Sequence, residues 1–423
     1  MKHRIRSHPL VQTLLGLQGN QKACVLTEPL WNIPHSLYAP FFTVYMYALG
    51  IDDRQIGMLL SIGMVMQVLT TLFGGVLNDK LGRRWTTLIF DTIAWTIPTL
   101  LWSIAQNYTW FLVAAVFNGF WQITSNSWNC LLVEDADERE LVNVYTWITI
   151  TGLMSVFFAP LTAVMVHRMG LVPAMRILLF ATCVLMTTKF IVLHFTTTET
   201  RQGVIRMRET KGVPIRSLMR GYKDIYKKLI HSKKMLLLLA ILTIHKITST
   251  ISGNFFSLLA TQNLGVPEEW LAYYPIARAA VMLIFIFTIQ HLVNRLPYQI
   301  PLTIGIVLYG ISQLLLVLAP SGNAAFLFLY VLSDAFAASL FIPQKDSLTT
   351  IFIEKQERSR LISLIYIIMI AISTPFGWIS GALSEWNRRS PFFMNIILYV
   401  ICLVLVVFAT TVGKKKRKST IAN

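Results

Sequence analysis

Stretches of about twenty mostly apolar residues recur along the whole of this 423-residue chain. Each is long enough for a helix to cross the ~30 Å hydrocarbon core of a bilayer at ~1.5 Å per residue. Apolar residues make up 55% of the chain and charged residues only 13%, which is more apolar surface than a soluble fold could bury. The sequence therefore predicts an all-α polytopic membrane protein with twelve transmembrane helices. The stretches fall at approximately 26–49, 55–78, 85–105, 109–133, 142–166, 171–194, 235–262, 269–293, 298–319, 323–351, 360–384 and 391–412.

The net charge of +17 is distributed in a way that argues against nucleic-acid binding. Basic residues cluster before residue 23, in 201–234 and in 414–418, beside apolar stretches. Positive charge marks the cytoplasmic ends of transmembrane helices. We therefore expect both termini in the cytoplasm, a plasma membrane location (the inner membrane in a bacterium), the lipid bilayer as partner and no nucleic acid. A signal peptide at the basic start is disfavoured, because no small-residue cleavage site follows it.

A polar stretch at 196–234 divides the apolar stretches into two sets of six. We predict a cytoplasmic arm at 1–25, an N-terminal six-helix bundle at 26–195, a basic linker at 196–234, a C-terminal bundle at 235–412 and a basic tail at 413–423. Helical spacing of apolar residues in 215–229 indicates an amphipathic helix on the inner leaflet, with a solvated linker helix as the alternative. Short segments of the first half weakly resemble segments of the second half at a similar separation along the chain: 41–52 resembles 255–268, 79–81 resembles 294–296, and 138–139 resembles 357–358. These matches favour two pseudo-symmetric bundles.

Residues 75–84, between the second and third predicted spans, read GVLNDKLGRR. This decapeptide resembles the loop signature of the major facilitator superfamily at every fixed position. The resemblance implies the fold of that superfamily, and a secondary transporter that acts as a monomer and exposes a central site alternately to each side. We expect a close helix contact at the first glycine, a tight turn at the second, and an acid paired with an arginine or a helix N-terminus. The predicted conformational latch consists of Gly75, Asp79, Lys80, Gly82, Arg83 and Arg84.

Two departures from the superfamily's proton-coupled and drug-exporting members weaken a drug/proton antiporter interpretation. Residues 114–119 in the fourth span carry no arginine, which proton-coupled members often have there. In the fifth span Ala159 precedes Pro160, where drug antiporters often have Gly-Pro.

The fourth span carries amide and hydroxyl side chains at spacings of four, three and four residues, which places them on one face of a continuous helix. Polar side chains in a bilayer face a cavity or another helix. Amides beside indoles would suit a neutral polar ligand such as a sugar, whereas hydrogen bonding between helices is the structural alternative. The predicted substrate-binding face consists of Asn118, Trp121, Gln122, Ser125 and Asn129.

Other polar residues inside the predicted spans are functional candidates, since burying them is costly. Arg278 and Asp334 should lie at similar mid-depth and could pair. For each of these ionisable residues a structural ion pair is the alternative, and Arg176 and Lys189 are expected to extend toward the membrane surface. The further substrate-binding candidates are Asn32, His35, Tyr38 and Lys246, with His245 a weaker one; the proton-carrying candidates are His35, Asp91 and Asp334.

The sequence contains no P-loop, HExxH motif or Cys/His spacing typical of metal sites, so we predict neither an enzyme nor a bound cofactor. We favour a secondary active transporter of a small polar organic solute, sugar-like and coupled to protons, with facilitated diffusion left open. An exporter of amphipathic drugs or lipids is the first alternative, and a transporter of anions, resting on Arg278, is the next. A membrane receptor that moves nothing is a further alternative.

Overall fold

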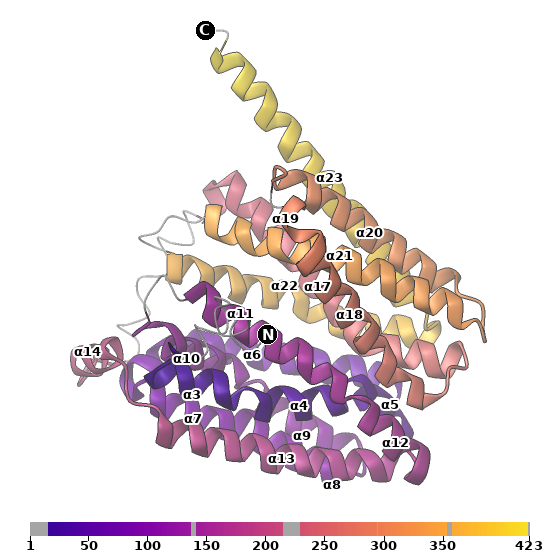
Figure 1. Ribbon diagram of the computed structural model, residues 1–423, viewed down its shortest axis with the longest axis horizontal. Coiled ribbons are helices and arrows are strands. Elements are labelled where there is room, and N and C mark those ends of the chain that lie inside the picture. Colours follow the sequence, from indigo (N-terminus) through magenta and orange to yellow (C-terminus); the bar gives the residue numbers. More distant parts are fainter. Residues whose placement is uncertain (1–15, 137–140, 215–228, 294, 353–357, 422–423) are drawn as a thin grey trace, which may run out of the picture. The chain divides into compact units, whose positions relative to one another are not determined.

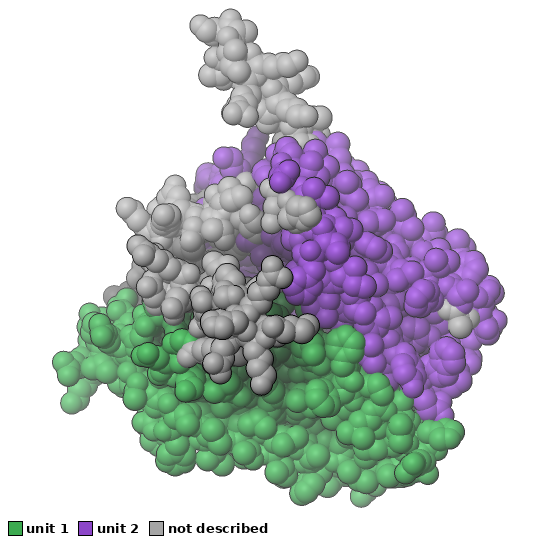
Figure 2. Space-filling model, in the orientation of Figure 1, with its two compact units in different colours: residues 1–51, 62–220 green, residues 52–61, 221–423 purple. Residues whose placement is uncertain are grey.

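The computed structural model describes residues 16–136, 141–214, 229–293, 295–352 and 358–421. These residues form helices joined by short turns, with no strand among them (Figure 1). The chain forms two compact units, coloured separately in Figure 2. Unit 1 comprises residues 1–51 and 62–220, and unit 2 comprises residues 52–61 and 221–423.

Unit 1 is built from helices whose interruptions occur mostly at proline and glycine. Pro40 begins the break after α4, Gly82 separates α6 from α7, and Gly119 separates α9 from α10. The helices are α3 (Gly19–Thr27), α4 (Pro29–Tyr38), η1 (Ala39–Phe41), α5 (Phe42–Ala48), α6 (Asp53–Leu81), α7 (Arg83–Asp91), η2 (Thr92–Thr96), α8 (Ile97–Ile104), α9 (Tyr108–Asn118), α10 (Trp121–Val133), α11 (Leu141–Ser155), η3 (Val156–Phe158), α12 (Pro160–Met169), α13 (Leu171–Thr196) and α14 (Arg201–Glu209).

Unit 2 contains the first turns of α6 and the helices that follow the linker. They are α17 (Lys233–Leu258), η4 (Leu259–Asn263), η5 (Glu268–Ala272), α18 (Tyr273–Thr288), α19 (Gln290–Val293), α20 (Gln299–Leu318), α21 (Ala324–Phe352), α22 (Arg358–Trp386) and α23 (Ser390–Ile421).

Ten segments of the described chain are helical, long enough and apolar enough to cross a membrane, which confirms an all-α polytopic membrane protein. The first and fourth predicted spans are helical but fall outside these ten, because each is divided into shorter helices. The first is interrupted near Pro40 and the fourth at Gly119, which packs tightly against Met66 of α6. The total of twelve spans therefore remains a prediction.

Residues 16–25 pack into unit 1, although the sequence predicted a separate arm. Leu17, Ala23 and Cys24 are buried against Leu131 of α10 and Leu193 of α13. Burial of these apolar side chains is the physical reason that the segment folds onto the bundle. The basic residues before residue 16 and the predicted amphipathic helix at 215–228 lie outside the described residues. So do parts of two of the internal matches, at 138–139, 294 and 357.

An arginine near the start of the sixth predicted span of each half caps the third span of the same half. The Arg176 guanidinium donates to the carbonyl of Ala105, just after α8, at 3.1 Å. Arg389 donates to the carbonyls of Val317 and Ala319, at the end of α20, at 3.0 and 2.7 Å. Arg176 is exposed and satisfies a carbonyl that the end of α8 leaves without a partner; its extension toward the membrane surface remains a prediction. Because both halves of the chain share this arginine cap, the structure supports a duplicated six-helix bundle.

The first turns of α6 pack on α22 within unit 2, which the sequence did not indicate. Asp53 is almost fully buried, accepts a hydrogen bond from Ser384 at 2.6 Å and pairs with Arg388 at 3.1 Å. One turn further, Gly57 contacts the backbone at Gly377, so that no larger side chain fits there. Helices approach this closely only where small residues face one another.

We predict that Arg389→Met destabilises unit 2, because the carbonyls at the end of α20 lose their donor. The expected loss is about 1–3 kcal/mol for buried acceptors without partners. Thermal unfolding of the detergent-solubilised protein measures it. The matched control is Arg168→Met, since Arg168 is exposed at the end of α12. Equal melting temperatures for the two variants would contradict the capping role.

Candidate functional site

The interior of unit 1 holds a buried ion pair. The Lys189 ammonium of α13 lies 2.8 Å from a carboxylate oxygen of Glu28, in the turn that starts α4, and both side chains are almost fully buried. The ammonium also lies 5.9 Å from the centre of the Trp31 ring and 5.6 Å from that of Trp128. Lys189 was predicted to extend toward the surface; this was wrong, because a carboxylate and two indole faces stabilise its charge inside the bundle.

Asp91 lies beside this pair, at the end of α7. It is 7% exposed, shares a hydrogen bond with the Thr124 hydroxyl and interacts electrostatically with Lys189. The next turn, η2, is π-helical and leaves one carbonyl, that of Ala94, to accept a hydrogen bond from the Asn118 amide at 2.9 Å. Turns of this kind occur often at functional sites. We call Glu28, Asp91 and Lys189 the unit 1 charge cluster.

The first-span candidates lie near this cluster. The His35 ring stacks on Trp31, with 4.8 Å between ring centres, and meets Tyr38 edge-on at 5.3 Å. The Asn32 amide donates to the Thr151 hydroxyl of α11 at 3.4 Å. The structure therefore brings Trp31, which the sequence analysis had not singled out, between His35 and Lys189.

The polar residues of the fourth span do not lie on one continuous helix, because the chain breaks at Gly119. Asn118 belongs to α9 and bonds to Ala94, as noted above. Asn129 of α10 is exposed and accepts a hydrogen bond from the Tyr145 hydroxyl at 2.6 Å. These two amides thus make the interhelical bonds that were the structural alternative. The remaining members of the predicted face, Trp121, Gln122 and Ser125, are half-buried on α10.

The interior of unit 2 holds a second ion pair, and here the predicted pairing is confirmed. The Arg278 Nε of α18 lies 2.7 Å from an oxygen of Asp334 of α21. The aspartate side chain is 14% exposed and the arginine side chain 41%, so part of the guanidinium remains open. Arg278 also hydrogen-bonds to Tyr309, whose ring stacks on that of Tyr399 at 5.1 Å.

A buried amide network continues from these tyrosines. Gln313 of α20 is fully buried, hydrogen-bonds to Tyr330 and accepts from the Asn395 amide at 3.0 Å. Asn395 also donates to the Ser252 hydroxyl at 3.2 Å. We call Arg278, Asp334 and this network the unit 2 polar network.

Two buried polar atoms near this network, the Tyr274 hydroxyl and the His245 Nδ1, have no hydrogen-bond partner among the described residues. His245 packs against Phe341, with ring centres 4.9 Å apart, and Lys246 is half-buried beside it in the chain. Buried polar groups without partners are uncommon in native structures and often mark ligand sites.

The predicted latch forms a compact charged joint within unit 1. The guanidinium of Arg83, which is almost fully buried, lies 3.1 Å from Asp79 and 3.0 Å from Glu134 and also donates to the carbonyl of Asn78. The expected pairing of Asp79 with an arginine is therefore confirmed. Lys80 is half-buried, and the Arg84 Nε donates to the carbonyl of His194 at 2.7 Å.

Glu199, which the sequence analysis missed, caps helix α7. Its two carboxylate oxygens accept from the backbone N–H groups of Arg83 and Arg84 at 2.9 and 3.0 Å. Gly82 has φ +80° and its Cα lies against this carboxylate, so only glycine fits, as the motif predicts. The expected close contact at Gly75 is wrong: Gly75 is exposed, and its neighbour Gly74 faces Ile123 instead. No sequence signal links residue 199 to the motif.

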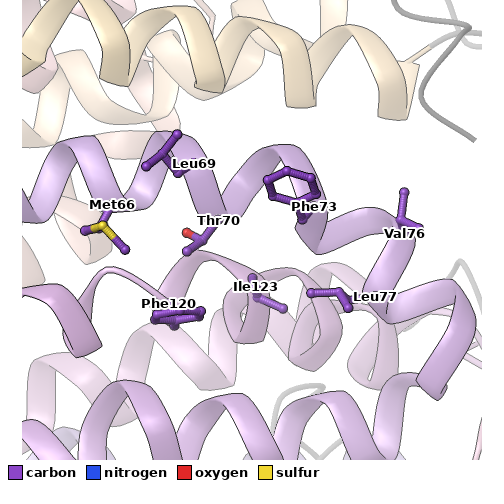
Figure 3. Close-up of a pocket in the computed structure, with 8 residues that line it drawn as sticks. All are labelled: Met66, Leu69, Thr70, Phe73, Val76, Leu77, Phe120 and Ile123. Carbon is purple, nitrogen blue, oxygen red and sulfur yellow. The ribbon is translucent and has the colours of Figure 1, made fainter. Parts of the chain in front are cut away.

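An apolar cavity of about 400 Å³ lies between α6 and the start of α10 in unit 1 (Figure 3). Its one polar side chain, Thr70, already donates to the carbonyl of Gly119 at 2.8 Å. The cavity therefore offers no free hydrogen-bonding group to a polar solute. Its lining consists of Met66, Leu69, Thr70, Phe73, Val76, Leu77, Phe120 and Ile123.

Buried charges inside apolar helices and a bundle of membrane-spanning length define a polytopic membrane protein with polar sites inside it, which is typical of transporters. The sequence profile of the Major Facilitator Superfamily matches residues 33–282 and 247–423. The chain therefore belongs to this superfamily of membrane transporters. Among the described residues no cluster of His, Cys, Asp and Glu could hold a metal ion.

Solved structures with this fold include the nucleoside transporter NupG and peptide transporters of the POT family. NupG has a TM-score of 0.69 at 14% identity, covering 94% of this chain and 100% of that one. A POT family transporter in complex with a thioalcohol-conjugated peptide has a TM-score of 0.70 at 11% identity, covering 95% and 99%. At these identities the likeness concerns the fold alone.

Among curated proteins, the quinolone resistance protein NorA of Staphylococcus aureus is 25% identical over 83 residues. The match covers 20% of this chain and 21% of NorA.

We predict that Arg83→Gln destabilises unit 1 by about 1.5–3 kcal/mol, because the half-buried carboxylates of Asp79 and Glu134 lose their charged hydrogen-bond donor. Thermal unfolding in detergent measures the loss. The control is Arg206→Gln, which removes an exposed pair with Glu209 and should change the stability by no more than about 1 kcal/mol. If the two variants melt together, the joint does not stabilise the fold.

Proposed function

We propose that the protein is a secondary active transporter that moves a small polar organic solute by alternating access and is coupled to protons. The observation that carries this proposal is the unit 2 polar network, in which a partly open guanidinium is held by Asp334 among buried tyrosines. Charged groups inside a bilayer are costly and typically serve a substrate or ion pathway. Alternating access is the mechanism that membership of the superfamily implies.

The chemistry of the network favours a polar solute with several hydroxyl or amide groups, such as a sugar-like metabolite. Tyrosine hydroxyls both donate and accept hydrogen bonds, and the open face of Arg278 only donates. The Tyr274 hydroxyl and His245 Nδ1 would gain partners from such a ligand. Since Asp334 neutralises Arg278, an anionic solute is less favoured than a neutral or zwitterionic one. Solved proteins with this fold carry nucleosides or peptides, which are also polar organic solutes.

Export of amphipathic drugs or lipids is the second candidate. The apolar cavity lined by Phe73 and Phe120 favours it, because it would accept a ring or an acyl chain. The short match to a quinolone resistance protein points in the same direction.

The proposal also includes the proton carriers, the location and orientation in the membrane, and the oligomeric state. His35, Asp91 and Asp334 are the candidate proton carriers. The charge distribution supports placing both termini in the cytoplasm. The proposal also includes a location in the plasma membrane and a functional monomer.

A thermal-shift screen of the purified protein against classes of metabolites, followed by uptake into liposomes, tests the function. Stabilisation by sugars or related polyols, and uptake that increases with a pH gradient, are expected. If only hydrophobic cations stabilise the protein, export of amphipathic drugs or lipids becomes the favoured function and transport of a polar solute is contradicted. Binding of a solute without any movement across the liposome membrane would indicate a receptor.

We predict that the double variant Arg278→Met/Asp334→Leu folds but no longer binds the solute. Replacing both members of an ion pair with apolar residues of similar volume is often neutral or stabilising, whereas removing one leaves a buried charge. The melting temperature without solute should therefore change less than in Arg278→Met, while the solute-dependent shift disappears. Arg295→Met, at an exposed position of unit 2, is the control and should retain the shift. An unchanged shift in the double variant would exclude the network from binding.

A further inference from the structure

The unit 1 charge cluster contains two carboxyl groups and one ammonium group. Glu28, Asp91 and Lys189 are 8%, 7% and 5% exposed, so solvent water stabilises none of their charges appreciably. If all three were ionised, the cluster would carry a net negative charge in a medium where an unpaired carboxylate is very unfavourable. One carboxyl group must therefore hold a proton for the cluster to be neutral.

The contacts decide which carboxyl group that is. Glu28 accepts a hydrogen bond from the Lys189 ammonium at 2.8 Å, a geometry that favours the ionised form of both partners. Asp91 has no ion pair among the described residues; its hydrogen-bond partner is the neutral Thr124 hydroxyl. A hydroxyl can accept from a protonated carboxyl group as readily as it donates to an ionised one. Asp91 is therefore the protonated member.

Lys189 is not an alternative carrier of the exchangeable proton. Its ammonium has the Glu28 carboxylate on one side and the faces of Trp31 and Trp128 at 5.9 and 5.6 Å. All three contacts favour the charged form of the amine.

We propose that the unit 1 charge cluster is a proton-binding centre in which Asp91 binds and releases the proton while Lys189 and Glu28 remain ionised. On release, the O–H bond of the Asp91 carboxyl group breaks, the proton passes to water, and the charge of the cluster changes from zero to minus one. Lys189 is then attracted by two carboxylates at once. This inference deepens the proposed proton coupling, and its role in transport rests on that proposal.

The elements packed around α7 present few other groups that could take the proton. The helix packs against α10, α13 and η2. Toward Asp91, α10 presents Thr124, α13 presents Lys189, and η2 has no ionisable side chain. Glu28 faces the cluster from the start of α4, and Cys24 of α3 contributes a thiol near Lys189 and Glu28.

His35, on α4, stacks on Trp31 with 4.8 Å between ring centres and meets Trp95 edge-on at 6.5 Å. Tyr38 meets the His35 ring edge-on and is also titratable. The infrared test below distinguishes Asp91 from both groups, because neither imidazole nor phenol has a carboxyl band.

Infrared difference spectroscopy of the purified protein, titrated from mildly acidic to mildly alkaline pH, tests the assignment without any substrate. The wild type should show the carbonyl stretch of a protonated carboxyl group, and the band should disappear as the pH rises. Labelling aspartate with ¹³C at the side-chain carboxyl carbon should shift this band in the unaltered protein, which needs no variant to fold.

Variants of the cluster residues identify the residue that gives rise to the band. The band should be lost in Asp91→Asn and retained in Asp334→Asn, the matched control in unit 2. The charge-balanced Glu28→Gln/Lys189→Met variant should retain it, whereas Lys189→Met alone should show about twice the amplitude, since both carboxyl groups then take protons. A band that persists unchanged in Asp91→Asn, or that does not shift on aspartate labelling, would overturn the proposal, as would its absence from the wild type.

Uptake into liposomes separates this inference from the proposed function. Asp91→Asn should lose the accumulation of solute that a pH gradient drives in the wild type. If a pH gradient does not change wild-type uptake while the infrared carboxyl band of Asp91 is present, the proposed proton coupling is wrong, whereas the proton-binding centre is supported.

Discussion

A polar group inside a bilayer has no water to bond to, so it must find its partner within the protein. This constraint accounts for most of the contacts that organise the two units. Arg176 and Arg389 satisfy the carbonyls at the ends of two helices, and Asn118 satisfies the carbonyl that the π-helical turn at Ala94 leaves over. Each of these side chains would be unfavourable in lipid by itself. Paired, they tie one helix to the next and fix how the helices can pack.

Under the same constraint the two ionic sites differ in how they reach a net charge of zero. Unit 2 pairs one cation with one anion, Arg278 with Asp334, and this pair is neutral without any proton. Unit 1 combines Lys189 with two acids, Glu28 and Asp91, and becomes neutral only when one acid is protonated. On the proposed function, the first arrangement suits recognition of a solute and the second suits exchange of a proton. The division follows from counting charges rather than from the identity of any single residue.

The sequence predicted the helices, the family and the Arg278–Asp334 pair, because each depends on composition, on a local motif or on depth along a helix. It did not predict that Glu28 pairs with Lys189. Lys189 lies near the end of the sixth predicted span, and the sequence did not predict that helix α3 packs against Leu193 of α13 at that end of the bundle. The polar face of the fourth span was assigned to one helix, whereas the chain breaks at Gly119, where the backbone packs closely against Met66 of α6. Sequence spacing does not indicate that contact.

The signature loop at 75–84 likewise predicts only part of the contacts that it makes. Residues 75–84 supply the cation Arg83, one of its anions and the glycine of the turn, but not the remaining acceptors. These come from Glu134 at the end of α10 and from Glu199 after α13, and Thr200 donates to Glu134 at 2.5 Å, joining the two. The cap from Glu199 also explains why only glycine fits at position 82, since the carboxylate occupies the space of a side chain. The motif therefore specifies half of a joint, and its other half lies on segments that only the fold brings to it.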